Sequence, residues 1–253
     1  MEVHAHTHTT DPGASRGKKW THYFWEFFML FLAVTLGFFV ENQREHYIEH
    51  KREKQFITTL VEDLKSDTAQ LNLNILYRKN RERMADSLIL LLSLPDNRNY
   101  GADIYFYARN LSRPQYFFPN DRTLQQLKNS GAMRLIRKLS VSDSIMFYDQ
   151  SLRYLQFLFT YEIDMRDQYR SHAIKIFNGR IFNEQHDPKN ITLYKKPQGN
   201  PPLVTYDFQL INEFIVSTQY LKSVTKGIRA RQENTRSIAE RLLVFLQKEY
   251  HLK

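Results

Sequence analysis

Residues 26–41 read EFFMLFLAVTLGFFVE, with fourteen uncharged and mostly apolar residues between two glutamates. By length alone such a stretch is typical of a buried core helix, because a membrane span usually needs about 18 or more apolar residues. Extending it backwards to Trp20 gives WTHYFWEFFMLFLAVTLGFFV, residues 20–40. At about 1.5 Å per residue, this longer stretch covers the roughly 30 Å hydrocarbon core of a bilayer. The sequence therefore predicts a transmembrane helix over 20–40.

The composition of this stretch is also typical of a membrane-spanning helix. Trp20, Tyr23 and Trp25 gather at one end, as aromatic residues do at a membrane interface. Apart from Thr35, residues 27–40 are apolar on every side of a helix, whereas a core helix of a soluble protein carries a polar stripe. Because no small-residue cleavage site follows, we expect an uncleaved anchor rather than a signal peptide.

Glu26 lies inside the predicted span, where a carboxylate is by default a candidate functional group. His22 precedes it by four residues and therefore lies on the same face of the helix. Two interpretations stay open. Glu26 either reaches the interface and pairs with His22 or Lys19, or it contacts a neighbouring helix in an oligomer or lines a proton path.

The segment after the span, ENQREHYIEHKREKQ over 41–55, predicts a charged helical stem. Opposite charges recur three positions apart, so they offset one another along the helix. His46 and His50 stand in this spacing to Glu49 and Glu53, and these contacts would strengthen as the pH falls to about 6.5, where histidine gains its proton. The stem is either an ordinary solvated helix or a pH-responsive element.

Beyond the stem, the sequence predicts an all-α domain over 56–253. An apolar stripe at helical spacing runs from residue 56 to 94, and it can continue the span and the stem as one helix over 20–94. Ser140 and Asp143 resemble a capping box that opens a long helix reaching about residue 176. Shorter helices are expected at 103–111 and 120–131. A loop follows over 183–206, with a possible strand at 191–195, and a final long helix covers 207–250.

Two long helices of matching length most simply pack antiparallel. The predicted fold is therefore an N-terminal transmembrane helix that continues into a stem, with an antiparallel helical bundle outside the membrane.

The charge balance favours anionic partners, since 36 Lys and Arg against 27 Asp and Glu give a net charge of +9. The basic residues are spread along the chain and interrupted by acids, so we interpret them as solvated helix faces and expect no nucleic-acid partner. The chain contains no cysteine, which excludes disulfides, cysteine zinc sites and thiol catalysis.

Motifs that carry catalytic chemistry are missing. We find no Glu-x-x-His, HExxH, glycine-rich phosphate loop or GxSxG, and therefore expect neither an enzyme nor a cofactor. The residues 1–19 predict a disordered tail in which His4, His6 and His8 are weak candidates for metal ligands. A mid-chain cluster of acidic and histidine residues is interpreted as surface groups: Glu162, Asp164, Asp167 and His172.

Three stretches together resemble a bacterial protein family: GFFVENQRE (37–45), REKQFITTLVEDLKSDTAQL (52–71) and DRTLQQLKNSGAMRLIRKLSVSDSIMFYDQSLRYL (121–155). In this uncharacterised family, a domain of unknown function, a single N-terminal span leads to a helix, a turn like that of residues 127–131 and a long C-terminal helix. The resemblance covers most of residues 20–250. It implies a single-span, membrane-anchored helical protein and carries no known activity, cofactor or catalytic residue.

We therefore expect a structural or protein-interaction protein of the bacterial envelope, whose partners are the lipid bilayer and either another protein or further copies of the chain. The short basic N-terminus favours an inner-membrane protein with its body in the periplasm. A sensory or ligand-binding domain, in which Glu26, His22, His46 and His50 would act, is the alternative.

Overall fold

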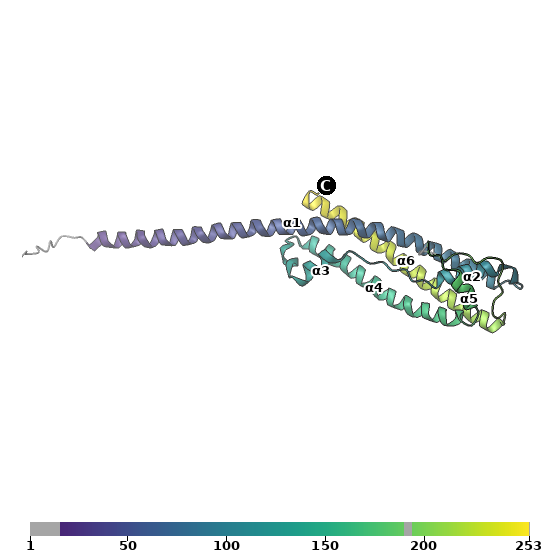
Figure 1. The fold of residues 1–253 in the computed structure, drawn as a ribbon. Coiled ribbons are helices and arrows are strands. Elements are labelled where there is room, and N and C mark those ends of the chain that lie inside the picture. The colour runs from purple at the N-terminus through teal and green to yellow at the C-terminus, as the bar shows by residue number, and fades with distance from the viewer. Residues whose placement is uncertain (1–15, 190–193, 253) are drawn as a thin grey trace, which may run out of the picture. The chain divides into compact units, whose positions relative to one another are not determined.

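The computed structural model describes residues 16–189 and 194–252, and side chains from residue 20 onward. Every regular element in these residues is a helix, so the all-helical prediction is confirmed (Figure 1). The α-helices are α1 (Arg16–Leu92), α2 (Gly101–Leu111), α3 (Arg122–Asn129), α4 (Leu139–Ala173), α5 (Gly179–Glu184) and α6 (Phe208–Tyr250), with short 3-10 turns at Arg98–Tyr100 and Ala132–Leu135.

The chain divides into two compact units, Met1–Glu53 and Lys54–Lys253, and the division falls inside α1. In the described part of the first unit, the chain is helical throughout. As expected for one helix over 20–94, no proline interrupts α1, which ends at Leu92 just before Pro95. The buried core lies in the second unit.

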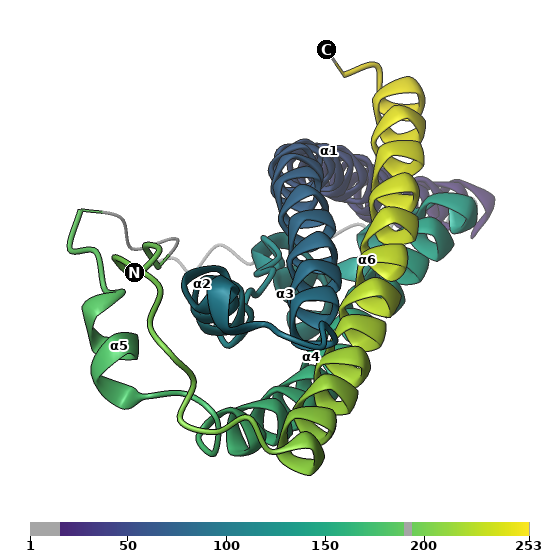
Figure 2. The ribbon, with the colours of Figure 1, turned by 90° about the vertical axis from the view of Figure 1, so that its right-hand side faces the viewer.

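In the second unit, α4 and α6 lie side by side and run in opposite directions (Figures 1 and 2). Lys138, just before α4, pairs with Glu249 at the end of α6 at 2.5 Å. At the other end, Lys175 lies 3.5 Å from Glu213 near the start of α6. Ion pairs therefore join this pair of helices near both of its ends.

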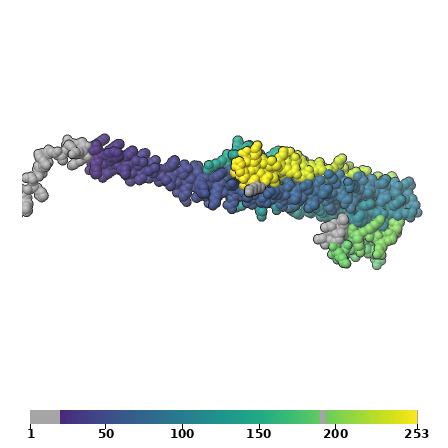
Figure 3. All heavy atoms as spheres, turned by 90° about the horizontal axis from the view of Figure 1, so that it is seen from above, coloured from purple at the N-terminus to yellow at the C-terminus, as the bar shows by residue number. Residues whose placement is uncertain are grey.

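The part of α1 beyond Lys54 packs along α6, and Figure 3 shows the two helices adjacent on one face. Arg229 of α6 donates to both carboxylate oxygens of Glu82 at 2.6 and 3.2 Å. About two turns further along α6, Arg236 donates to Asn72 of α1 at 2.5 Å. The later residue of α6 therefore contacts the earlier residue of α1, so these two helices also run in opposite directions.

The core consists of two apolar clusters. One gathers the first part of this α1 segment, α3, the start of α4 and the end of α6, with Leu64, Leu127, Leu152 and Leu242 among its members. The other gathers the end of α1, α2, the end of α4 and the start of α6, and Tyr105, Tyr169, Phe177 and Phe214 pack there ring against ring. Several buried residues between the clusters are charged, among them Arg78, Glu162 and Arg166, and these belong to the candidate site.

A close approach of the backbone fixes the start of α2. A Cβ atom added to Gly101 would lie 2.0 Å from the carbonyl oxygen of Pro201, so this position admits only glycine without a shift of the chain. Asn200 holds the same loop, because its side chain accepts from Ala102 N at 3.2 Å and donates to Arg98 O at 2.7 Å. The loop 194–207 is thereby held against α2.

One boundary prediction was wrong. The capping box at Ser140 and Asp143 does not form, because Lys138 O already accepts from Val141 N and Ser142 N at 3.0 and 3.1 Å. The helix therefore begins at Leu139, which leaves Ser140 inside its first turn. The loop predicted near 183–206 follows α5, which ends at Glu184. Most of the possible strand at 191–195 lies outside the described residues.

Candidate functional site

In the first unit, the side chains of residues 20–40 are exposed, apart from the half-buried Leu32. Trp20 and Phe38 keep 79% and 76% of their surface. Within the described residues, one helix, α1, is long and apolar enough to cross a membrane, and none of its most apolar window is buried. A signal sequence near an N-terminus would have the same length and composition.

Glu26, the carboxylate of this stretch, has a partner one turn away. Its Oε1 atom lies 3.2 Å from His22 Nε2, and both side chains are exposed. A protonated imidazole in this position would neutralise the carboxylate and so lower the free energy of placing it in an apolar medium. Thr35 is satisfied as well, because its hydroxyl donates to Phe31 O at 2.7 Å.

The stem histidines contact the glutamates that their spacing predicts. His50 Nδ1 lies 3.3 Å from Glu53 Oε2, and His46 Nδ1 lies 4.0 Å from Glu49 Oε2. Whether these contacts serve a pH response stays a prediction.

A layer of buried charges crosses the second unit between its two apolar clusters. Glu162 of α4 accepts from Arg78 Nη1 and Nη2 at 3.1 and 2.9 Å, and from Arg166 Nη2 at 2.6 Å. At most 3% of each of these residues is exposed. Burial raises the pKa of Glu162, but the charges and hydrogen bonds of Arg78, followed by the charge of Arg166, outweigh it, so the pKa lies below its ordinary value.

The interpretation of Glu162 as a surface group was therefore wrong. Glu162 follows Phe159 by three residues and continues the buried stripe of α4, where a charge is retained because two guanidinium groups pair with it. Asp164 and Asp167 are exposed as predicted, and His172 is half-buried beside Glu213, at 3.6 Å.

Sequence reasoning missed the arginines around this layer, which cap the C-terminal end of α2. The unpaired carbonyls there carry partial negative charge. Arg81 of α1 donates to Asn110 O at 3.1 Å and also to Leu111 O. From α4, Arg166 donates to Leu111 O at 3.2 Å and Arg170 to Ser112 O at 2.7 Å. Three guanidinium groups from other helices thus donate to the carbonyl oxygens that a local C-cap would otherwise satisfy.

The N-terminal end of α3 is capped by negative groups instead, the buried carboxylates of α1. Asp63 accepts from Arg122 Nε at 2.9 Å and from Thr123 Oγ1 at 2.5 Å. Asp67 accepts from Asn120 N at 2.7 Å and from Tyr148 Oη at 2.6 Å. Negative side chains therefore meet the end of α3 that carries partial positive charge.

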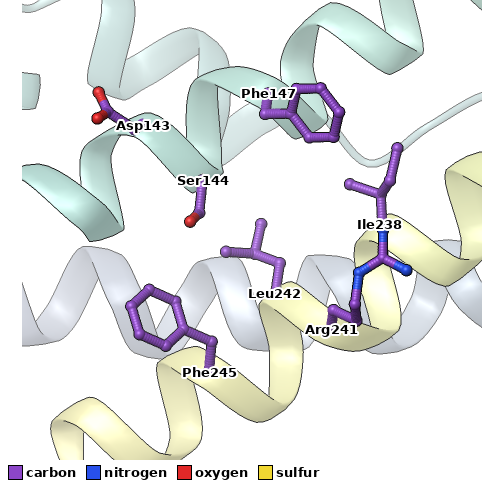
Figure 4. Close-up of a pocket in the computed structure, with 7 residues that line it drawn as sticks. All are labelled: Asp143, Ser144, Phe147, Ile238, Arg241, Leu242 and Phe245. Atoms are coloured by element: carbon purple, nitrogen blue, oxygen red, sulfur yellow. The ribbon is translucent and has the colours of Figure 1, made fainter.

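Among the hollows on the surface of the second unit, two have volumes above 500 Å³. One, of about 580 Å³, lies between α4 and α6, where Phe147 and Ser144 face Leu242 and Phe245 (Figure 4). The other, of about 530 Å³, lies beside the arginine-capped end of α2 and is lined by further arginines. The chemistry of the second hollow is considered below.

Within the described residues, no group of three or more histidine, aspartate or glutamate side chains could hold a metal ion. The candidates His4, His6 and His8 lie outside these residues.

No protein-family model, no curated protein and no solved structure matches the chain. The resemblance to a bacterial single-span family therefore gains no support from these comparisons, and function has to be argued from the residues themselves.

Proposed function

We propose that this chain is a membrane-anchored helical protein that crosses a bilayer once, with residues 20–40, and acts as a structural or protein-interaction component of a bacterial envelope. The observation that supports the proposal best is the continuous exposure of apolar side chains over residues 20–40. A core helix would bury these side chains within the chain, and none of the apolar window is buried.

The energetics of this segment favour a bilayer as its surroundings. Each large apolar side chain that leaves water gains about 1.5–3 kcal/mol. A helix also satisfies its own backbone hydrogen bonds, which an apolar medium requires. The polar side chains Thr35 and Glu26 have partners on the same helix, so the segment carries little unsatisfied polarity into lipid.

The second unit supports a role in protein interaction. In this proposal it is the predicted antiparallel bundle, with α6 running against α1 and α4. Phe147, Tyr154 and Tyr161 recur every seven residues along α4 and therefore share one face. These side chains are 45–55% exposed, and the neighbouring Phe157 is 66% exposed. Contiguous exposed apolar surface is typical of a protein-binding face.

Extraction of membranes with carbonate tests the anchor. The full chain is expected to stay in the membrane fraction, whereas a variant lacking residues 20–40 is expected in the supernatant. Mass determination of the full chain separates an anchor from a signal sequence, because a leader would be removed. Release of the full chain by carbonate, or a mature protein that lacks residues 20–40, would refute the anchor.

Crosslinking in intact cells, followed by purification in detergent, tests the interaction role. We expect crosslinked species that contain either a second copy of the chain or another protein. A strict monomer without any crosslinked partner would contradict this part of the proposal, whatever the outcome for the anchor.

A pH-responsive sensory role is the second candidate, and the contacts of His46 and His50 with Glu49 and Glu53 favour it. Protonation turns each contact into an ion pair, so the stem should become more rigid at about pH 5.5 than at 7.5. Hydrogen exchange of residues 41–53, corrected for the intrinsic effect of pH, measures this change. Equal protection at both pH values in the full chain, or the same response after His46→Gln and His50→Gln, would exclude the stem as a sensor.

A further inference from the structure

The hollow at the C-terminal end of α2 has a cationic wall that the proposed function does not use. Its volume is about 530 Å³. Arg109, Arg113, Arg170 and His186 line it, and Asp187 adds one carboxylate. A space of this size accommodates a small molecule, and its lining determines which chemical class fits.

Aromatic rings hold two of these arginines in place. The guanidinium carbon of Arg109 lies 4.4 Å from the ring centre of Tyr194 and 5.0 Å from that of Phe182. Arg113 lies 5.1 Å from the same Tyr194 ring. Tyr194 is fixed in turn by Asn110, which accepts from its backbone nitrogen at 2.9 Å. Stacking against these rings thus orders both guanidinium groups.

The hydrogen-bonding capacity of Arg109 is not used within the described residues. Its Nε atom is buried and has no hydrogen-bond partner there. Arg170, which also lines the hollow, differs, because it donates to Ser112 O at 2.7 and 3.2 Å and to Asp167 at 3.0 Å. A buried donor without a partner raises the free energy of the folded state unless a bound group accepts from it.

Positive charge exceeds negative charge around the hollow. Arg78, Arg81 and Arg166 lie just behind its arginines, on the carbonyls of α2 and the residues that follow it. Among these arginines, Arg78 and Arg166 pair with Glu162 and Arg170 pairs with Asp167, while Asp187 lines the hollow.

Arg166 is affected both by its burial and by the neighbouring cations. Burial, and then the charge of Arg81, lower its pKa to about 10, although Glu162 opposes the change. An anion bound nearby would relieve this repulsion.

We propose that this hollow binds an anionic ligand through a phosphate group, with Arg109 as the principal donor and with Arg113 and Arg170 adding positive charge to its lining. Several guanidinium groups arranged around one space suit a multiply charged tetrahedral oxyanion, because each presents its N–H groups as a planar fork. The phosphate belongs either to a small soluble compound or to a lipid headgroup. The volume leaves room for part of the molecule that carries it.

Thermal unfolding of the full chain in detergent, with inorganic phosphate as the probe, tests the site. Each sample is compared with sodium chloride at the same ionic strength, so that general screening cancels. We expect phosphate to raise the unfolding midpoint in a saturable way, since a ligand that binds only the folded state stabilises it. No phosphate-specific rise in the unsubstituted protein would overturn the proposal.

Substitutions locate the binding. Arg109→Gln is expected to weaken the apparent affinity about 10-fold or more, the size of the loss of a charge-assisted hydrogen bond. Arg83→Gln removes the same charge from an exposed position of α1 and should behave like the unsubstituted protein. Should Arg109→Gln fail to fold, Arg170→Gln at the exposed rim takes its place. Equal phosphate responses in the site variant and in Arg83→Gln would show that binding lies elsewhere.

Mixed micelles distinguish the two sources of the phosphate. A stronger response to phosphatidic acid than to inorganic phosphate or pyrophosphate assigns a lipid headgroup, and a stronger response to the soluble anions assigns a small molecule. Because the soluble arm does not depend on membrane insertion, its failure leaves the proposed anchor untouched, and the reverse also holds.

Discussion

Replacing Glu162 by glutamine perturbs the buried charged layer with the least change of shape. The carboxylate accepts three hydrogen bonds, two from Arg78 and one from Arg166. Glutamine nearly preserves the volume, but it removes the negative charge and one of the two acceptor oxygens. Two buried guanidinium groups would then lack their common counter-charge.

The magnitude follows from these contacts. Removing one partner of a buried ion pair costs about 3–5 kcal/mol, because the remaining charge stays buried without compensation. Arg78 and Arg166 keep acceptors at Gln115 O and Leu111 O, each at 3.2 Å, which reduces the loss. We therefore expect Glu162→Gln to lower the free energy of unfolding by about 3 kcal/mol, the lower end of that range. For a unit of this size, that corresponds to a fall of roughly 6–12 °C in Tm.

Denaturant unfolding of the full chain in detergent, followed by circular dichroism, measures this loss. Glu240→Gln is the matched control, since Glu240 is exposed on α6 and lies 3.5 Å from Arg236. An exposed pair of this kind contributes at most about 1 kcal/mol. If Glu162→Gln destabilised the protein no more than Glu240→Gln, the buried layer would not depend on charge pairing and our reasoning would be wrong.

Acidification offers a second measurement on the same variant. Because the folded pKa of Glu162 is lowered, its contribution to stability is complete above the unfolded pKa of about 4.3 and is lost as the pH falls through the folded pKa. The difference in stability between the unsubstituted protein and Glu162→Gln should therefore shrink in acid. A difference that grew below pH 4.3 would contradict the sign of the shift.

Three further predictions concern other parts of the second unit. Gly101→Ala should lower stability by about 1–3 kcal/mol, because the added Cβ would clash with Pro201 O. Gly227→Ala in α6 should raise stability by about 0.5–1 kcal/mol, because nothing lies within 4 Å of its Cβ, and thermal unfolding that showed effects of the same sign would contradict this. Burial raises the pKa of Asp67, so the unsubstituted protein should lose stability relative to Asp67→Asn as the pH rises above about 3.9. Plots of unfolding free energy against pH, from denaturant unfolding of the two proteins, should converge or cross rather than stay parallel. Phe157→Ser should change stability by less than about 0.5 kcal/mol while reducing crosslinking to a partner, and undiminished crosslinking would place the partner on another surface.

Features that depend on neighbouring residues could be predicted from the sequence. The apolar spacing over 207–250 predicts α6, and the helix occupies Phe208–Tyr250. Asp207 caps it by accepting from Leu210 N at 3.0 Å. Gly131, expected to end the helix before it, has a φ of 69° just beyond α3, a conformation that glycine adopts without strain. Each of these signals is contained in a few consecutive residues.

Features that depend on distant partners could not be predicted in the same way. A signal for the buried layer was present, since Glu162 stands where the apolar stripe of α4 should continue after Phe159. Its partner Arg78 is 84 residues away, however, and no local pattern joins the two. The capping arginines bind backbone carbonyls, which every residue carries, so their targets leave no mark in the sequence. The Ser140 pattern failed for the converse reason, because a local motif is overruled when the helix begins before it.

The two capped helix ends explain why the phosphate site would be formed before its ligand arrives. Neither α2 nor α3 has a side-chain cap of its own at its N-terminus. The connection between them is fixed by arginines at one end and by Asp63 and Asp67 at the other, so the long helices determine where the backbone after Leu111 lies. A ligand that meets ordered guanidinium groups loses less free energy to their ordering.

Glu162→Gln should therefore weaken phosphate binding although Glu162 does not line the hollow, because it frees Arg166 from its counter-ion and loosens the carbonyl of Leu111. Arg109→Gln should weaken binding with a smaller loss of stability, since Arg109 is held by rings and supports no helix end. If Glu162→Gln lowered stability but left phosphate affinity unchanged, the buried layer and the hollow would be independent, and preorganisation of the site through α2 would be excluded.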